Sequence, residues 1–238
     1  MSIEALQQMI DGSRSIVFFG GAGVSTESGL KDFRSEDGLY RERYPYPPET
    51  MLSHSFFMAH PDEFYAFYRD KLLCPGVKPN AAHCKLAELE AAGKLSAVVT
   101  QNIDGLHQMA GSQNVLELHG SVHRNTCMKC RKRYGLDAIL GCEGVPRCEC
   151  GGIIRPDVVL YEEPLDADVI DAAVRAISEA DMLIVGGTSL AVYPAAGLID
   201  YFEGGSLVLL NKSSTAYDAR AALRICAPIG QTLSQIHV

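Results

Sequence analysis

The chain has 238 residues, 47% of them hydrophobic, which is enough to bury a sizeable core in one large domain or in one domain with inserts. Its 29 acidic and 21 basic residues give a formal net charge of −8, which argues against a protein that mainly neutralises phosphate backbones or anionic lipid. We therefore expect neither a nucleic acid nor a membrane as a partner.

The start of the chain and its apolar runs indicate a cytoplasmic location. The first ten residues, MSIEALQQMI, lack the charged segment followed by an apolar one that marks a signal peptide. No apolar run approaches the roughly 20 residues that span a bilayer. Because cytoplasmic thiols stay reduced, the eight cysteines are interpreted as metal ligands, catalysts or core residues before disulfides are considered.

Strands and helices are predicted to alternate along most of the chain. One helix is predicted over 80–92, with Asn80 as its N-cap, and another over 166–180, where apolar residues recur every three or four positions. The strands are short, nearly continuous apolar runs, typical of a parallel sheet that is covered on both faces: 15–19, 97–100, 182–185 and 207–210. This alternation predicts a doubly wound α/β domain.

Two segments interrupt the alternation and are predicted to be insertions. Residues 32–79 are rich in aromatic residues and proline, which indicates a loop followed by a helix. Residues 122–155 hold five of the eight cysteines and show little apolar periodicity. We expect a single domain over 1–238, with a sheet part formed by 1–31, 80–121 and 156–238, a helical insert over 32–79 and a cysteine-rich insert over 122–155.

The cysteine-rich insert predicts a zinc ribbon. Cys127 and Cys130 form one close pair, and after 17 residues Cys148 and Cys150 form a second, which is how a ribbon presents four thiolates to one zinc ion. The segment has too little apolar content to fold by packing alone, so metal binding would supply the free energy of ordering. The alternative is a loop of unpaired thiols.

The choice of ligands in the second pair has a rival. Cys142 lies six residues before Cys148, but we favour Cys148 and Cys150 because Gly151 and Gly152 follow them and allow a tight turn. A site closed by four thiolates has no open coordination position. We therefore expect one structural zinc ion per chain.

A glycine-rich loop, GGAGVSTESG over 20–29, follows the first predicted strand. Gly21 and Gly23 fit the first two positions of a dinucleotide fingerprint, where the backbone approaches a pyrophosphate. The third position is Thr26, and no second strand with an acidic end follows at the expected distance. The loop alone is thus compatible with a plain strand–helix turn, and an ordinary dehydrogenase is disfavoured.

Polar residues also follow three other predicted strands, at 101–104, 186–189 and 211–212. In open α/β sheets, ligands bind beyond the carboxyl ends of the strands. One such end is explained by helix capping, for which these residue types are also suited. Four ends together favour a nucleotide cleft.

His119 is the candidate general base of this cleft. It precedes Gly120, between a short apolar run and the cysteine-rich insert, and a histidine accepts a proton near neutral pH. The alternative is a satisfied core histidine. The other six histidines are expected in solvated or capping positions: His54, His60, His83, His107, His123 and His237.

These segments together resemble the sirtuins, the NAD-dependent protein lysine deacylases. GAGVSTESGLKDFR, TQNIDGLH, ELHG, the two cysteine pairs, IIRPDVVLYEE, GGTSLAVYPAA and LLN occur in the sirtuin order from about Gly20 to Ile229. The chain is most similar to the short bacterial deacetylase-type members. The resemblance implies a Rossmann-like parallel sheet domain with a smaller inserted domain made of a zinc ribbon and a helical segment.

The resemblance also implies the reaction: transfer of the acetyl group from acetyl-lysine to ADP-ribose, with release of nicotinamide and O-acetyl-ADP-ribose. Succinyl or long-chain deacylation and mono-ADP-ribosyl transfer in the same cleft are the alternatives. A zinc-ribbon binding module with a degenerate pocket is a third interpretation, but it would be expected to lack His119, Asn102 or Asp104, and all three are present.

Residue roles follow from the same resemblance, with NAD as co-substrate. His119 is implied as the general base, and Asn102, with Ser25, as the residue that orients the ribose and an ordered water. The implied cofactor-binding residues comprise the phosphate loop, a segment that closes over NAD, the ribose and nicotinamide contacts and the adenosine contacts: Ala22 and Thr26; Phe33 and Arg34; Gln101, Ile103 and Asp104; Thr188, Ser189, Asn211 and Ile229. An acetyl-lysine-bearing protein or peptide is expected as an added strand along Val159, Leu160 and Tyr161, between the two domains.

Three positions depart from the family pattern. Lys31 replaces a proline, which should make its loop more flexible. Glu162 replaces the glycine of the peptide-pairing segment, a change that puts the peptide register in doubt and suggests a preference for cationic flanks. Desuccinylating relatives carry Tyr-x-x-Arg, whereas Tyr68 is followed here by Lys71, which lacks the bidentate fork, so acetyl is favoured over succinyl.

Overall fold

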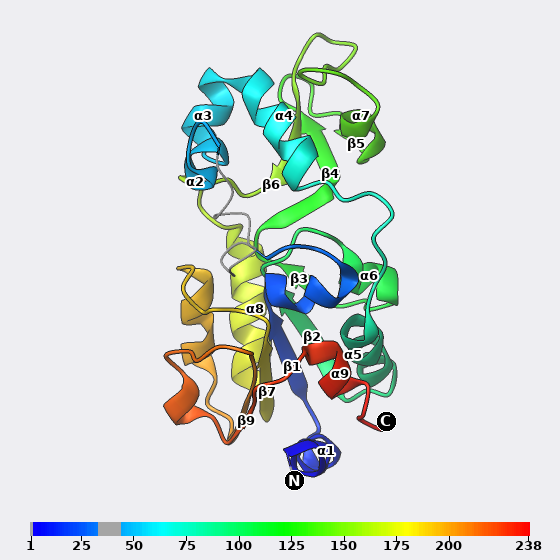
Figure 1. Cartoon of the computed structure of the whole chain (residues 1–238), viewed down its shortest axis with the longest axis vertical. Helices are drawn as coiled ribbons and strands as arrows, with labels where there is room; N and C mark the ends of the chain where they lie inside the picture. The colour runs from blue at the N-terminus through cyan, green and yellow to red at the C-terminus, as the bar shows by residue number, and fades with distance from the viewer. Residues whose placement is uncertain (1, 33–43) are drawn as a thin grey trace.

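Six parallel strands form the sheet at the centre of the larger part of the molecule, in the order β3–β2–β1–β7–β8–β9 (Figure 1). The computed structural model describes residues 2–32 and 44–238. The strands are β1 (Ile16–Gly20), β2 (Leu95–Thr100), β3 (Val115–Glu117), β7 (Met182–Gly186), β8 (Ser206–Leu210) and β9 (Leu223–Ile225). The predicted parallel sheet is confirmed, with the short strands β3 and β9 added at its two edges.

Helices cover both faces of the sheet, and every residue of β1 and β7 is therefore buried. Along β1, alternate side chains enter different cores: Val17 and Phe19 pack towards α8 (Ala167–Glu179) and η4 (Ala195–Tyr201), while Ile16 and Phe18 pack in the core of the opposite face. That opposite face is covered by α1 (Ser2–Gly12), α5 (Ala81–Ala91), α6 (Leu106–Ala110) and α9 (Ile229–Leu233).

The first predicted helix begins at its expected N-cap, Asn80, and the second begins after an N-cap at Asp166 that was not predicted. The Asn80 side chain accepts a hydrogen bond from the N–H of Ala82, and the Asp166 side chain accepts from Asp168 and Val169. Each cap satisfies backbone donors that have no partner within the helix. Three short 3₁₀ segments, η1 (Ala22–Val24), η2 (Thr26–Ser28) and η5 (Asp218–Arg220), lie in loops that follow strands.

A smaller part sits above the sheet in Figure 1 and has its own core. It combines α2 (Pro48–Met51), α3 (His54–Ala59) and α4 (Pro61–Lys71) with an antiparallel sheet, ordered β5–β4–β6, and α7 (Asp137–Leu140). The strands of this sheet are β4 (Gly120–Cys127), β5 (Arg133–Tyr134) and β6 (Ile154–Val158). They extend slightly beyond the cysteine-rich insert as predicted over 122–155.

The described portion of the helical insert differs from the sequence prediction of one loop and one helix. Pro48 and Pro61 each occupy the first turn of a helix, where the missing N–H of proline costs no hydrogen bond. Ser53 caps α3 between them by accepting from the N–H of Phe56 at 3.2 Å. The predicted helix corresponds to α4, and two further short helices, α2 and α3, lie in the segment predicted as a loop.

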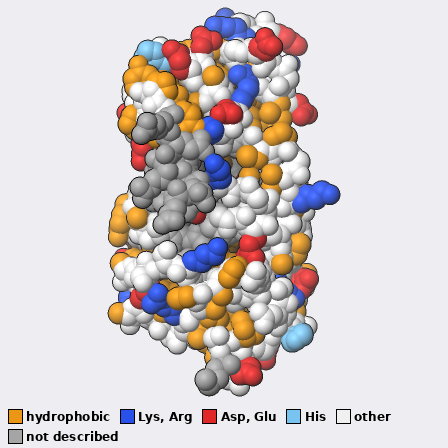
Figure 2. Space-filling view, viewed as in Figure 1, with side chains coloured by type: hydrophobic (Ala, Val, Ile, Leu, Met, Phe, Trp, Pro, Cys, Tyr) orange, Lys and Arg blue, Asp and Glu red, His pale blue; other side chains and the backbone are white. Residues whose placement is uncertain are grey.

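The surface is mixed in character. On the face drawn in Figure 2, acidic and basic side chains are interspersed among polar and apolar ones. No helix within residues 2–32 and 44–238 is long and apolar enough to cross a membrane.

Candidate active site

The glycine-rich loop after β1 touches the loop after the neighbouring strand β7. The N–H of Gly23 donates to the carbonyl of Gly187 at 2.8 Å, and that of Gly21 donates to the carbonyl of Gly186 at 3.3 Å. A Cβ on Gly23 would lie 2.7 Å from Gly187 Cα, and one on Gly187, whose φ is +61°, would lie 2.4 Å from the nitrogen of Val24. Side chains are therefore excluded from this contact.

This contact lies where the strand order reverses. From β1 the chain builds β2 and β3 on one side, and it then returns to place β7 on the other. Doubly wound sheets bind ligands at such a switch point, beyond the carboxyl ends of the strands. The half-buried Ala22 and Thr26 flank this turn, and the Thr26 hydroxyl donates to the carbonyl of Gly23 at 3.0 Å.

Three polar side chains meet beyond the end of β2. The Ser25 hydroxyl donates to Asp104 Oδ2 at 2.7 Å and accepts from Asn102 Nδ2 at 3.1 Å. The other oxygen of Asp104 accepts from the N–H of Leu106 at 3.0 Å. Ser25 and Asn102 are buried, so the network is held largely away from solvent. Ile103 lies between Asn102 and Asp104 in sequence and packs against the core of the small part.

The ends of β2, β7 and β8 are joined by a second network. Gln101 Nε2 donates to Thr188 Oγ1 at 3.0 Å. Asn211 accepts from the N–H of Thr188 at 3.1 Å and donates to its carbonyl at 2.9 Å. Ser189 is exposed beside them, and Ile229 is buried below, where its Cδ1 would lie 3.2 Å from a Cβ on Gly186.

His119 lies between β3 and β4, at the junction of the two parts of the molecule. Its Nδ1 is 2.9 Å from the carbonyl oxygen of Gln101, so the tautomer that satisfies this carbonyl carries its proton on Nδ1. Burial lowers the pKa of His119 below its usual value, although the hydrogen bond to Gln101 opposes that shift. The ring is therefore neutral at pH 7, and Nε2 is available as a proton acceptor.

The backbone around His119 explains the glycine that follows it. Gly120 has φ +75°, and a Cβ there would lie 2.0 Å from the carbonyl oxygen of Asp157. Only glycine lets β4 come this close to β6. The carbonyl of His119 then accepts from the N–H of Val159 at 3.0 Å, which ties the candidate base to the predicted peptide-pairing segment.

Two other histidines are buried near the site, and the expectation for His107 was wrong. His83 does act as a cap, since its Nδ1 accepts from the N–H of Asn80 at 3.2 Å. His107 is neither solvated nor capping: its ring lies 4.7 Å from that of His83, and neither of its nitrogens has a hydrogen-bond partner among the described residues. Burial lowers the pKa of His107 to about 3. No sequence signal in LHQMA distinguishes it from an exposed helical histidine.

The four predicted zinc ligands come together in the small part. The sulfur atoms of Cys127, Cys130, Cys148 and Cys150 all lie within 4.8 Å of one another, and the eight cysteines of the chain are free thiols. A Cβ on Gly152 would lie 2.7 Å from Cys127 Sγ, so the glycine turn after the second pair is needed for the approach. Four sulfur donors at this spacing suit a tetrahedral zinc ion.

Cys142 is not part of this group. Its sulfur accepts from Arg69 Nη2 at 3.2 Å and donates to the carbonyl of Ala138 at 3.5 Å. Arg69 also donates to the carbonyls of Ile139 and Gly144, so it holds the loop around Cys142 in place. The rival ligand is thereby occupied elsewhere.

The peptide-pairing segment after β6 is attached along one edge to the helical insert. The N–H of Tyr161 donates to the carbonyl of Leu52, and the carbonyl of Tyr161 accepts from the N–H of His54, both at 3.0 Å. No described residue donates a hydrogen bond to the carbonyl oxygen of Val159. An unpaired backbone acceptor thus remains on the segment beside His119.

Two further residues named from the sequence, Tyr68 and Lys71, lie apart from these networks. Phe33 and Arg34 fall outside the described residues. Tyr68 is fully buried, and its hydroxyl has no partner in the part of the chain that the structure describes. Lys71 instead pairs with Asp70 at 3.0 Å and lies over the ring of Tyr44.

Comparison with known proteins gives consistent matches along the chain. A model of the Sir2 family matches residues 21–194. A protein of Clostridium acetobutylicum named NAD-dependent protein deacetylase is 59% identical over 238 residues, covering 98% of this chain and 97% of its own length. A Clostridium perfringens protein with the same name is 60% identical, with 98% of both chains covered.

Solved structures show the same similarity in three dimensions. A Sir2 structure with a p53 peptide and NAD+ aligns with a TM-score of 0.86 and 40% identity, covering 98% of this chain and 96% of the other. A Sir2 variant with a deacetylated p53 peptide and 3′-O-acetyl ADP-ribose aligns with a TM-score of 0.90 and 39% identity, at the same coverage.

Proposed function

The chain belongs to the Sir2 family and is an NAD-dependent protein deacetylase, and on that premise we propose that His119, at the junction of its two parts, is the general base of the reaction. The reaction transfers the acetyl group of acetyl-lysine to ADP-ribose and releases nicotinamide. The observation that carries the assignment is the position of His119: half-buried and neutral, fixed through Nδ1 by Gln101, and bonded through its carbonyl to Val159.

NAD fits the strand ends that surround this histidine. The contact of Gly23 with Gly187 leaves backbone rather than side chains at the switch point, which is what a pyrophosphate requires. We assign Ala22 and Thr26 to the phosphates. The other proposed contacts are Gln101, Asn102, Ile103 and Asp104 for the ribose and nicotinamide, and Thr188, Ser189, Asn211 and Ile229 for the adenosine half, with Phe33 and Arg34 retained as predictions.

The reaction divides the work between substrate and protein. The acetyl oxygen bonds to the ribose carbon of NAD that carries nicotinamide, and the bond from that carbon to nicotinamide breaks. His119 takes a proton from a ribose hydroxyl through Nε2, and the Gln101 carbonyl keeps the ring in the tautomer that this requires. Ser25, Asn102 and Asp104 form a preorganised polar wall that orients the nicotinamide ribose.

Acetyl-lysine is proposed to enter as part of an extended segment along Val159, Leu160 and Tyr161. The backbone of Tyr161 is already bonded to the helical insert, whereas the carbonyl of Val159 accepts from no described residue and is available to an incoming N–H group. Lys71 pairs with Asp70 and lies over Tyr44, and a lysine lacks the bidentate fork that would best hold an acyl carboxylate. Acetyl is therefore preferred to succinyl.

The small part is proposed to carry one structural zinc ion on Cys127, Cys130, Cys148 and Cys150. A ligand set of four thiolates leaves no position for substrate, so the ion orders the ribbon and takes no part in the chemistry. We also propose a cytoplasmic location, because these thiols must stay reduced to bind metal. Residues 1–238 would act as one catalytic domain with inserts over 32–79 and 122–155.

One experiment tests the proposed function directly. The purified protein is incubated with acetyl-, succinyl- and long-chain acyl-lysine peptides, with and without NAD, and the products are weighed by mass spectrometry. We expect NAD-dependent loss of the acetyl group, with equal amounts of nicotinamide and O-acetyl-ADP-ribose. Deacetylation without NAD, or nicotinamide release that is independent of acylated peptide, would contradict the proposal.

A further inference from the structure

The turn after the peptide-pairing segment has a backbone that suits glycine, yet it carries a glutamate. Glu162 has φ +76°, in the left-handed region that side-chain-bearing residues rarely adopt. A residue persists there only when its surroundings over-determine the conformation. At Glu162, the contacts of the carboxylate hold the backbone in this conformation.

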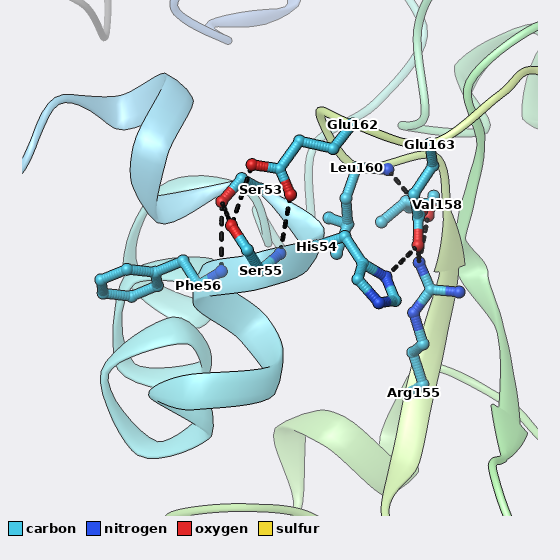
Figure 3. A network of polar contacts seen from close by, with 9 residues as sticks. All are labelled: Ser53, His54, Ser55, Phe56, Arg155, Val158, Leu160, Glu162 and Glu163. Carbon is cyan, nitrogen blue, oxygen red and sulfur yellow. Dashed lines mark hydrogen bonds and ion pairs between the residues drawn. The ribbon is translucent and has the colours of Figure 1, made fainter.

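The carboxylate of Glu162 reaches across to the start of α3 (Figure 3). Its Oε2 accepts from the backbone N–H of Ser55, and its Oε1 accepts from the Ser55 hydroxyl, both at 2.9 Å. Ser53 already satisfies the N–H of Phe56. Glu162 thus completes the capping of a helix that lies 107 residues earlier in the sequence.

Glu163 makes a second attachment from the same turn. It accepts from His54 Nδ1 at 2.8 Å, from Arg155 Nη2 at 2.5 Å and from the N–H of Leu160 at 2.9 Å. Burial raises the pKa of Glu163, but the hydrogen bonds from Leu160 and His54 and the charge of Arg155 outweigh burial and leave it below its usual value. The carboxylate is therefore ionised near neutral pH.

These contacts hold the peptide-pairing segment from three directions. Glu162 connects it to α3, Glu163 connects it to α3 and to β6, and the backbone of Tyr161 bonds to the residues on either side of Ser53. The orientation of the free Val159 carbonyl depends on this arrangement, since Val159 is three residues from the turn.

We propose that Glu162 is a positioning residue for the acyl-lysine substrate: its carboxylate, by capping α3, stabilises the left-handed turn that holds Val159, Leu160 and Tyr161 in the substrate-pairing conformation, with Glu163 as its partner. The inference rests on the proposed binding of peptide along this segment. Both oxygens of Glu162 are taken up by Ser55, so the carboxylate does not select cationic flanks. This role replaces the preference for cationic flanks that the sequence suggested for Glu162.

The test compares three replacements of Glu162 with a matched control. Glu162→Gln keeps a carbonyl oxygen that can accept from Ser55, Glu162→Ala removes the cap but keeps a Cβ, and Glu162→Gly removes the cap while suiting the positive φ. Glu143→Gln changes an exposed carboxylate in the same part of the molecule. For each protein, kcat and the KM values for acetyl-lysine peptide and for NAD are measured, together with direct binding of a fluorescent acetyl-lysine peptide.

We expect Glu162→Ala and Glu162→Gly to raise the peptide KM and weaken peptide binding by about three- to tenfold, the range that corresponds to loss of one helix cap. The KM for NAD should stay within about twofold, since none of the capping contacts reaches the strand ends. Glu162→Gln should retain most of the wild-type peptide affinity. Glu143→Gln should behave as wild type.

The Glu162→Gly variant distinguishes an effect of the lost helix cap from an effect of backbone strain at the positive φ. If Glu162→Gly binds peptide like wild type, or if peptide and NAD constants change in parallel, the positioning role is overturned while the deacetylase activity of the wild type stands. A wild-type protein that neither binds nor deacetylates the peptide would overturn both proposals. The thermal midpoint of each variant separates loss of folding from loss of peptide affinity.

Discussion

At the scale of single residues, the contacts of His119 distinguish it from the other buried histidines better than its pKa does. Histidines 83, 107 and 119 are all at least partly removed from solvent and have lowered pKa values, but only His119 combines a carbonyl on Nδ1 with a place at the junction of the two parts. Its neighbours in sequence, Leu118 and Gly120, fix that place by burial and by a close backbone approach.

Replacing His119 by alanine should lower kcat/KM for deacetylation by about 10²- to 10⁴-fold, the usual range for losing a general base. Zinc should remain near one ion per chain, because His119 is separate from the four-cysteine group. The measurement is peptide deacetylation followed by mass spectrometry, with metal content determined on the same sample. Near-wild-type turnover would remove His119 from the role of base.

The direction of the His119 pKa shift predicts a pH profile. Since burial lowers this pKa, the imidazole stays unprotonated further into the acid range than a free histidine. The acid limb of kcat/KM should therefore lie below about pH 6.5, the reference value for histidine. A limb at or above that pH, in an enzyme that remains folded across the range, would assign the limb to another group.

At the scale of elements, we expect the small sheet, unlike the large one, to depend on the proposed zinc ion. The large sheet has a separate hydrophobic core on each face, whereas β5 has only two residues and the loop 141–152 is held mainly by the cysteine turns and by Arg69. Removing one ligand should therefore loosen the ribbon and leave the parallel sheet folded.

Cys148→Ser and Cys142→Ser make a matched pair for this point. Both remove a thiol from the same loop, but only Cys148 lies in the four-sulfur group. Cys148→Ser should lose zinc and gain protease cleavage within residues 120–158, while Cys142→Ser should keep about one zinc per chain. Loss of zinc from Cys142→Ser alone would reverse the ligand assignment.

Elements with local signals were the predictable ones. The buried strands are recognisable as apolar runs, and the helices after Asn80 and Asp166 begin at residues whose side chains bond to the next turn. The two short helices α2 and α3 could not be predicted in this way, because Met51, Phe56 and Phe57 are held by a core shared with β6. A helix of four to six residues has little stability of its own.

The same distinction applies to the candidate site. His119, the cysteine pairs and the strand-end residues lie in short motifs, so their spacing alone carries information. The partner of Glu162 is 107 residues away, and the contact between Gly23 and Gly187 joins two loops separated by most of the chain. Such pairs are brought together by the topology of the sheet. No local pattern in the sequence indicates which of these distant residues will meet.

At the scale of the whole molecule, buried histidines link folding to pH. His83, His107 and His119 all have pKa values below the unfolded value of about 6.5, so the unfolded chain binds more protons as the pH falls. Their contribution to the free energy of unfolding is present above that pH and declines below it. For His107 the decline extends from about pH 6.5 towards pH 3.

The unfolding free energy, measured with denaturant at pH 7, 6 and 5, should therefore decrease as the pH is lowered. His107→Leu should make this decrease smaller, because it removes a group that protonates only on unfolding. His237→Leu, at an exposed position near the C-terminus, should leave the pH dependence unchanged. Equal slopes for wild type and His107→Leu would show that His107 does not control the pH dependence.

The contact between Gly23 and Gly187 has a consequence for inhibitor design. A compound that packs against the backbone of Gly23 and Gly187 meets no side chain at these two positions, and none can be introduced at Gly187, because a Cβ there would collide with the neighbouring loop. A substitution that expelled the compound would also deform the place proposed for the co-substrate. Substitutions that confer resistance to the compound would then have to lie at residues away from this contact. An inhibitor can be designed to avoid contact with those residues.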